Sequence, residues 1–283
     1  MYDKFIITGF SDEIGESSQI QFSHLNKLGI KYFEPRGING KNVTDLSEDE
    51  AIALRKEMDS YGINVSSIGS PIGKISIDDD FEPHMEKLKH TIKIAKIFGT
   101  KYIRIFSFFI PDENYEEHRE EVLRRMNLMT ELAEKENIIL LHENEKGIYG
   151  DNALRCFDVV SEIDSPNLRC VFDPANFVQC RQLSYPAAFN LLKPYIEYMH
   201  IKDAKEDCSV VPSGYGIGGI EDILKELQDS GWEGFLSLEP HLGDFKGLAD
   251  LEADKKTPVT EPSTPEKFEL AYNALKNILE RIG

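Results

Sequence analysis

A repeating unit of one strand and one helix is the feature that most constrains the fold of this chain. Eight short apolar runs with strand-forming composition begin near Phe5, Lys31, Ile63, Lys101, Asn137, Arg169, Glu197 and Gly234. Successive starts are 26 to 38 residues apart, so every gap has room for a loop, a helix and a return turn. This alternation predicts an α/β protein built on parallel strands.

The segments between these runs show helical periodicity. Ile220, Ile223, Leu224 and Leu227 follow the i, i+3, i+4, i+7 spacing of one apolar helix face, and similar faces occur within 85–98 and 268–279. Glycine stands where each of several helices should end and the next strand begin, as in Leu28-Gly29-Ile30, Tyr61-Gly62-Ile63, Phe98-Gly99-Thr100 and Ser230-Gly231-Trp232. Glycine at that position is typical of a helix that ends and turns into a strand.

Eight strands alternating with eight helices form either a closed barrel or a doubly wound sheet. The count of eight favours the barrel, and a length of 283 residues fits a (β/α)8 barrel of about 250 residues. A dinucleotide-binding loop is also missing, because Gly9-Phe10-Ser11-Asp12-Glu13 follows the first run in place of G-x-G-x-x-G. We therefore expect a single-domain (β/α)8 TIM barrel over residues 1–283.

Composition excludes several classes of partner. The formal net charge of −18 repels polyanions, so nucleic acid is not an expected partner. No 18-residue apolar stretch and no signal-peptide pattern occur, so no membrane partner is expected either. Four cysteines without a C-x-x-C pair indicate reduced thiols, and we expect a cytoplasmic protein. A homo-oligomer is compatible with these observations.

Ionisable residues end or nearly end four consecutive runs in the second half of the chain. Glu143 ends the fifth run, Asp173 the sixth and Glu239 the eighth, while His200 lies in the seventh. Barrel enzymes place their functional groups at the carboxyl ends of the strands. We therefore expect these four side chains to meet at one rim.

Three carboxylates at one place repel each other unless a cation lies between them. Each residue alone has an ordinary structural explanation, because a strand-end Asp caps helices and a strand His is often a core residue. Four of them on successive strands favour one divalent metal ion held by Glu143, Asp173, His200 and Glu239. Three oxygens and one imidazole suit Mn²⁺, which we expect, with Zn²⁺, Co²⁺ and Mg²⁺ as alternatives.

The motifs around these residues resemble those of the xylose isomerase-like barrel superfamily, the sugar phosphate isomerase/epimerase group. The resemblance spans the whole chain. It rests on His142-Glu143-Asn144, Phe172-Asp173-Pro174-Ala175-Asn176, His200-Ile201-Lys202-Asp203, Ser237-Leu238-Glu239-Pro240-His241, Phe33-Glu34-Pro35-Arg36 and Gly214-Tyr215-Gly216-Ile217-Gly218.

The resemblance implies that the four strand-end residues bind one metal and that Glu143 and Glu239 act as acid and base. The expected activity is a metal-dependent isomerase or epimerase that transfers a proton through an enediolate in a small sugar or keto-sugar, phosphorylated or not. The expected substrate-binding residues are Lys202, Asn176, Glu145 and Arg36. Period-2 alternation puts Lys202 on the same face as His200, where it meets a sugar oxygen or forms a salt bridge with a rim acid.

Departures from the ketohexose 3-epimerase pattern argue against that particular activity. Glu206 stands where the subfamily has arginine, Asn176 where it has histidine, and Tyr149 where it has a second glutamate. Glu145 replaces a histidine that many relatives carry and changes the charge presented to the substrate. Fold and metal site carry over from the resemblance, whereas that substrate does not.

Three other functions remain as alternatives or are excluded. A dehydratase or lyase of keto-sugar or inosose type begins with the same enolisation, so it is the main alternative. A non-catalytic sugar-binding barrel with a structural metal is another. The three-zinc repair endonuclease branch is excluded, because it needs many strand-end histidines and His24, His84, His90 and His118 fall in helical segments.

Two loops have open roles at this stage. The glycine-rich loop at 214–219 precedes a helix and could hold an anion such as a phosphate, although glycine-rich loops are more often turns. The stretch 243–265, rich in Asp, Lys, Thr and Pro, is expected to be a solvated loop, with a lid over the barrel mouth as the alternative.

Overall fold

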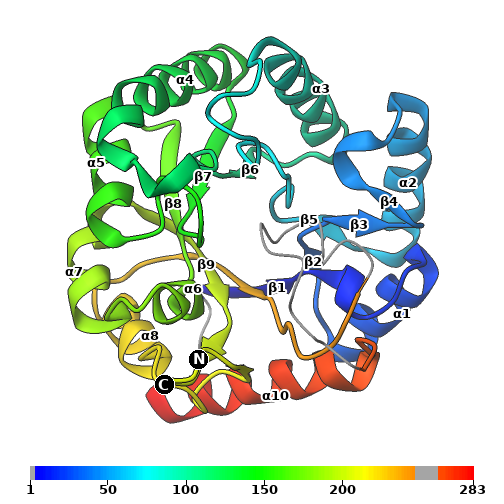
Figure 1. Ribbon diagram of the computed structural model, residues 1–283. Coiled ribbons are helices and arrows are strands. Elements are labelled where there is room, and N and C mark those ends of the chain that lie inside the picture. The colour runs from blue at the N-terminus through cyan, green and yellow to red at the C-terminus, as the bar shows by residue number, and fades with distance from the viewer. Residues whose placement is uncertain (1–3, 246–260) are drawn as a thin grey trace.

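The computed structural model describes residues 4–245 and 261–283, and it confirms the expected (β/α)8 barrel. A ring of parallel strands lies inside a ring of helices (Figure 1). Each barrel strand starts within two residues of its position predicted from the sequence. The strands are β1 (Phe5–Gly9), β2 (Tyr32–Phe33), β5 (Asn64–Val65), β6 (Tyr102–Ile105), β7 (Ile139–Glu143), β8 (Leu168–Phe172), β9 (Ile196–Ile201) and β12 (Gly234–Leu238).

Six of these strands form one parallel sheet in the order β1-β12-β9-β8-β7-β6, and β2 pairs with β5. Backbone hydrogen bonds join the two parts into a ring. Glu34 N donates to Gly9 O at 2.9 Å beside β1, and Ile68 N donates to Tyr102 O at 3.0 Å beside β6. Because all eight strands are parallel, their carboxyl ends lie at the same mouth of the barrel.

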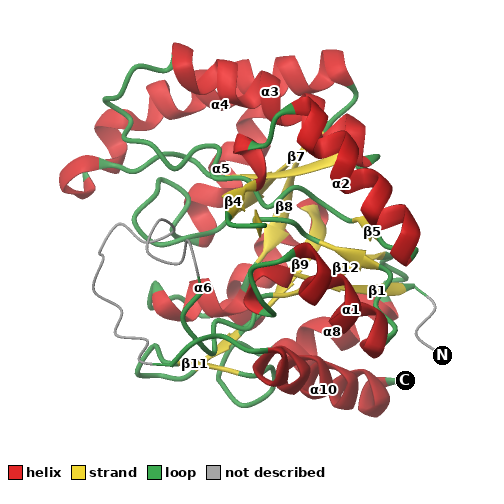
Figure 2. Cartoon of the chain, turned by 90° about the vertical axis from the view of Figure 1, so that its right-hand side faces the viewer, coloured by secondary structure: helices red, strands yellow, loops and turns green. Residues whose placement is uncertain are grey.

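The outer helices surround the strands (Figures 1 and 2), and they bury the apolar faces that the sequence indicates. The helices predicted within 85–98, 220–227 and 268–279 are confirmed as α3, α8 and α10. Gly62 and Gly99 end their helices with φ of +65° and +76°, a left-handed conformation that glycine adopts without strain. The outer helices are α1 (Ser18–Leu28), α2 (Glu48–Tyr61), α3 (Glu82–Phe98), α4 (Tyr115–Glu136), α5 (Ala153–Ile163), α7 (Phe189–Leu192), α8 (Ile220–Asp229) and α10 (Pro265–Ile282).

Three features depart from a plain strand–helix alternation. The sixth unit has a short extra helix, α6 (Pro174–Gln179), directly after Asp173, whose carboxylate caps it by accepting from Asn176 N at 2.9 Å. Two small antiparallel hairpins lie at the mouth of the barrel. They are β3 (Gly37–Ile38) with β4 (Lys41–Asn42), and β10 (Asp203–Ala204) with β11 (Val210–Val211).

The inside of the barrel changes from apolar to polar towards the mouth. Leu141, Val171 and Tyr198 form a buried inner cluster. The next layer up contains buried hydroxyls and one buried carboxylate, that of Glu34. Above it lie the strand-end acids. No helix within 4–245 and 261–283 has the length and apolar character needed to cross a membrane.

The glycine-rich loop after β11 binds a carboxylate of the protein itself. Asp203 is buried and accepts from the backbone N–H groups of Gly214 at 2.9 Å, Gly216 at 3.0 Å and Gly218 at 2.9 Å. A Cβ added to Gly216 would lie 2.3 Å from Asp203 Oδ1. These N–H donors are therefore already used, so the alternative in which this loop holds a substrate phosphate through them is not supported.

Replacing Asp203 by alanine should destabilise the fold. The substitution leaves backbone N–H groups of the loop without an acceptor, and one unsatisfied buried donor costs about 1–3 kcal/mol. The free energy of unfolding from urea titration should fall by at least that amount. Asp207→Ala is the matched control, because exposed Asp207 on the same hairpin accepts hydrogen bonds from neighbouring Ser209, and its loss should change stability little. An Asp203→Ala protein as stable as wild type would contradict this account of the loop.

Candidate metal centre

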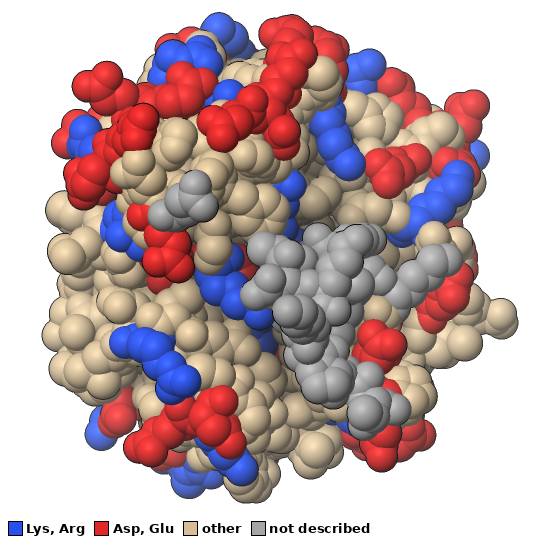
Figure 3. Space-filling view, in the orientation of Figure 1, with Lys and Arg blue, Asp and Glu red and all other residues tan. Residues whose placement is uncertain are grey.

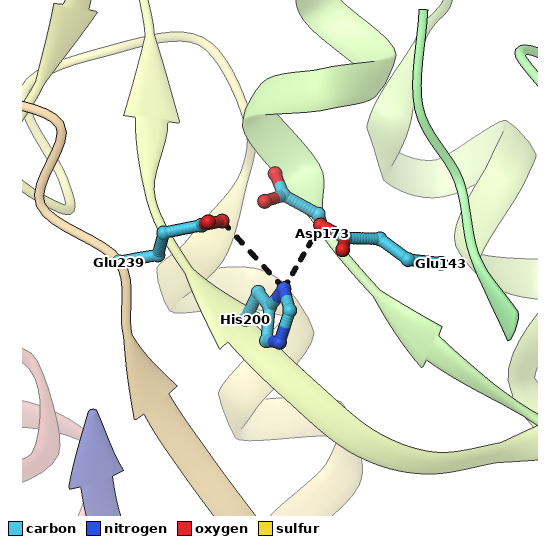
Figure 4. Close-up of side chains that lie close together, drawn as sticks. All are labelled: Glu143, Asp173, His200 and Glu239. Atoms are coloured by element: carbon cyan, nitrogen blue, oxygen red, sulfur yellow. Dashed lines mark hydrogen bonds and ion pairs between the residues drawn. The ribbon is translucent and has the colours of Figure 1, made fainter. Parts of the chain in front are cut away.

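Four side chains from four neighbouring strands meet at the mouth of the barrel. Glu143 ends β7, Asp173 follows β8, His200 lies in β9 and Glu239 follows β12. One potential ligand atom from each lies within 4.8 Å of the others, and all four residues are buried. Figure 4 shows Glu143 and Glu239 reaching the cluster from opposite sides, with Asp173 and His200 between them. The structure thus brings together the residues that the sequence singled out.

The His200 ring presents one nitrogen to the carboxylates and the other to the barrel interior. Nδ1 lies 2.9 Å from Glu143 Oε1 and 3.6 Å from Glu239 Oε2. Nε2 lies 3.3 Å from Glu34 Oε2, in the polar layer below. A metal-binding histidine commonly gives its second ring nitrogen to a carboxylate. Nδ1 is therefore the candidate ligand atom.

The donor set fits a divalent cation. Asp173 Oδ2 is buried and has no hydrogen bond within the described residues, although the Lys202 ammonium lies 3.1 Å from it. Burial and the neighbouring carboxylates of Glu239 and Glu143 raise the pKa of Asp173 above its usual value, despite the opposing effect of Lys202. Buried carboxylates that resist ionisation together are stabilised by a cation among them. Three oxygens and one imidazole nitrogen suit Mn²⁺, Mg²⁺, Co²⁺ or Zn²⁺.

Protonation of the histidine competes with metal binding. Burial lowers the pKa of His200, but the carboxylates of Glu143 and Glu34 outweigh burial and raise the pKa to about 10. The same charges that hold a proton on this ring would hold a cation. Because a histidine ligand must give up its proton, metal affinity at this site should rise with pH.

Each glutamate has one oxygen facing the cluster and one oxygen held by a buried arginine. Glu143 Oε2 accepts from Arg104 Nη1 at 3.0 Å, and Glu239 Oε1 accepts from Arg36 Nη1 at 3.0 Å. Burial alone would raise the pKa of Glu143, but His200 and Arg104 bring it below its usual value. Burial also acts to raise the pKa of Glu239, but Lys202 and the neighbouring histidines lower it further than burial raises it. Both glutamates are therefore ionised, with their inner oxygens fixed in place.

One aromatic ring supports both arginines. The guanidinium carbons of Arg36 and Arg104 lie 4.4 Å and 5.2 Å from the centroid of the Phe10 ring. The same ring meets His200 edge-on, with 5.1 Å between centroids. Neither Phe10 nor Arg104 was predicted from the sequence to be part of the site. A charged residue at an alternate position within the apolar run of β6 was the available signal for Arg104.

The four expected substrate-binding residues all lie at this mouth, and each has a partner in the protein. Lys202 Nζ lies 2.9 Å from Glu239 Oε2 as well as near Asp173, so the rim salt bridge forms. Asn176 Nδ2 donates to Glu143 Oε1 at 3.1 Å. Glu145 Oε2 accepts from Lys74 Nζ at 3.3 Å, and Arg36 binds Asp12 through two nitrogens. Contact with a substrate stays a prediction for all four.

A cavity of about 470 Å³ opens beside the cluster. Its lining includes Arg36, the β3–β4 hairpin, Asp244 and Phe245, and Arg36 connects it to Glu239. Figure 3 shows acidic and basic side chains interspersed around the rim of this face, with basic side chains also near its middle. Asp244 and Ser263 are joined by a backbone hydrogen bond at 2.6 Å. Most of the stretch 243–265 lies outside the described residues, so its role as loop or lid stays a prediction.

This chain is similar to known proteins both in sequence and in structure. Residues 22–257 match the model of a family described as xylose isomerase-like TIM barrel. The chain is also 25% identical over 184 residues to a 3-dehydroshikimate dehydratase of Bacillus anthracis. That alignment covers 58% of this chain and 65% of the relative's length.

Three solved structures share the fold. The probable 3-DHS dehydratase involved in petrobactin synthesis from Bacillus anthracis has a TM-score of 0.73 at 18% identity, over 96% of this chain and 98% of that one. A D-tagatose 3-epimerase-like protein has a TM-score of 0.72 at 19% identity, over 98% and 97%. A xylose isomerase-like barrel from Mycobacterium smegmatis, solved in complex with magnesium, has a TM-score of 0.67 at 17% identity, over 92% and 88%.

Adding Mn²⁺ or Mg²⁺ to metal-stripped protein should raise its thermal midpoint. A ligand that binds only the folded state stabilises it by about 2.7 kcal/mol at 100 times its dissociation constant. His200→Ala should lose this shift because it removes the only nitrogen of the donor set. His118→Ala, which changes a histidine on α4 outside the cluster, should keep it. Equal shifts in wild type and His200→Ala, measured by differential scanning calorimetry, would place the metal elsewhere.

Proposed function

Since the chain belongs to the xylose isomerase-like TIM barrel family, as its motifs indicated, we propose that it is a metal-dependent isomerase or epimerase of a small sugar or keto-sugar. The reaction moves a proton at a carbon beside a carbonyl group. The observation that carries the proposal is the placement of Glu143 and Glu239 on opposite sides of the cluster, each with one oxygen turned inwards. Mn²⁺ is the cation we propose.

The two glutamates are the acid and base of this proposal. Glu143 Oε1 and Glu239 Oε2 both face His200 Nδ1 within the cluster, and the lowered pKa of each group keeps it ionised. One carboxylate removes the C–H proton. The opposite carboxylate, once it has taken up a proton from solvent, delivers that proton to the other face of the same carbon and so inverts it, and proton exchange with solvent then restores both groups. A bound divalent cation would stabilise the negative charge that develops on the carbonyl oxygen.

Buried arginine and lysine side chains fix the geometry on which this proton transfer depends. Arg104 and Arg36 hold the outer oxygens of the glutamates, so each inner oxygen has a defined position. Lys202 bridges Asp173 and Glu239 at the same rim, within reach of a substrate oxygen. These side chains are all nearly inaccessible to water. A dry site of this kind strengthens each of these charge interactions.

A dehydratase of a keto-acid or keto-sugar is the second candidate. The sequence match to a 3-dehydroshikimate dehydratase favours it, although the alignment covers 65% of that relative. Proton removal beside the carbonyl is common to both reactions. In a dehydration the hydroxyl on the next carbon then leaves as water, after accepting a proton from an acid at the site. Product mass separates the candidates, because isomerisation and epimerisation conserve mass and dehydration does not.

Replacing Glu143 or Glu239 by glutamine should remove chemistry while largely keeping the metal. The amide oxygen remains a donor of similar reach, but the base is lost, so kcat should fall by at least ~10²-fold. The assay incubates protein and Mn²⁺ in D2O with each of a panel of small keto-sugars and with 3-dehydroshikimate. NMR then records deuterium incorporation beside the carbonyl, and mass spectrometry records loss of water.

Glu206→Gln is the matched control for these variants. Glu206 is an exposed glutamate near the mouth, so its substitution should leave the rate unchanged. If both active-site variants bind metal and turn over at the wild-type rate, the acid and base lie elsewhere. Lys202 and Glu145 would be the next groups to test.

A further inference from the structure

A buried carboxylate lies directly beneath the metal-facing histidine. We propose that Glu34 is a positioning residue. It fixes the His200 ring with Nδ1 towards the three acids and keeps the proton on Nε2. This role rests on the proposed metal site, and it concerns a side chain outside the four candidate ligands.

Glu34 reaches His200 from a distant part of the ring. It follows β2, and its backbone N–H donates to Gly9 O at 2.9 Å in β1. Its side chain is fully buried, and Oε2 lies 3.3 Å from His200 Nε2, within ion-pair distance although not aligned as a hydrogen bond. The ring is flanked by Phe10 and Tyr198, with centroids 5.1 Å and 5.9 Å away. These neighbours limit tilting of the His200 ring. Glu34 then needs only to determine which ring nitrogen faces the acid cluster.

The hydrogen bonds around Glu34 determine where the histidine proton lies. Tyr198 Oη donates to Oε2 at 3.0 Å, and Ser237 Oγ donates to the same atom at 2.7 Å. An oxygen that accepts from two hydroxyls behaves as an acceptor. A second acceptor facing it would be repelled, so Nε2 of the neutral ring must carry the proton. Nδ1 then presents its lone pair to the acid cluster, as metal binding requires.

The remaining oxygen of Glu34 argues against a purely structural role. Oε1 is buried and has no hydrogen-bond partner within the described residues. A carboxylate satisfied on one oxygen only is a costly way to fill a barrel interior, where an apolar residue or an amide would fit. The geometry at Oε2 supplies a reason for the charge at this position.

Mn²⁺ affinity measured by isothermal titration calorimetry tests the role directly. Glu34→Gln keeps the size of the side chain but removes its charge, so the dissociation constant should rise by about 10- to 100-fold. Glu206→Gln is the matched control, because it makes the same change at an exposed glutamate outside the cluster and away from Glu34. Its affinity should stay close to that of wild type. Glu34→Asp keeps the charge but withdraws it from Nε2, so it should weaken binding as well.

A second measurement needs no variant. Long-range ¹H–¹⁵N spectra of the wild type with Mg²⁺ should show the His200 proton on Nε2, and a proton on Nδ1 would overturn the proposal. Unchanged Mn²⁺ affinity in Glu34→Gln and Glu34→Asp would also overturn it, whatever their thermal stability. If wild type itself binds neither Mn²⁺ nor Mg²⁺, the proposed metal function fails first. The two failures are therefore distinguishable.

Discussion

Electrostatic repulsion among three buried carboxylates is the constraint on which the rest of the site depends. Glu143, Asp173 and Glu239 present oxygens within 4.8 Å of one another in a region that water hardly reaches. Such a cluster is stable only if positive charge lies within it and around it. The surrounding cations supply part of that charge, because arginines hold the outer oxygens and Lys202 bridges two inner ones. The carboxylate oxygens that must be neutralised for the fold to be stable are therefore the same atoms that the proposed chemistry uses.

Barrel topology explains why the acids could be found from the sequence. The strands are parallel and their neighbours pair in order, so strand-end residues of consecutive runs must meet at one mouth. Glu143, Asp173 and Glu239 stand at or just after such ends, and His200 faces inwards by simple alternation. Strand positions were predicted to within two residues because the apolar runs mark the segments that must be buried inside the barrel.

The remaining parts of the site depend on contacts that no local pattern records. Phe10 lies in an irregular segment after β1, and nothing near it in the chain indicates that two arginines stack on its ring. The closeness of Glu34 to His200 joins residues 166 positions apart across the barrel. The glycine loop at 214–219 has the composition of an anion-binding turn, yet the anion it binds is Asp203. The sequence identifies such backbone donors but not the acceptor atom to which they donate.

The contact of the Phe10 ring with both arginines limits how this site can change during evolution. Because one ring supports the guanidinium beside each glutamate and also the edge of His200, the two halves of the site do not adjust independently. Neighbouring residues with a common contact show non-additive effects when they are substituted together. Adaptation to a new substrate would therefore be epistatic at the strand ends that carry Arg36 and Arg104. It would proceed more freely in the mouth hairpins, which lie outside this shared contact.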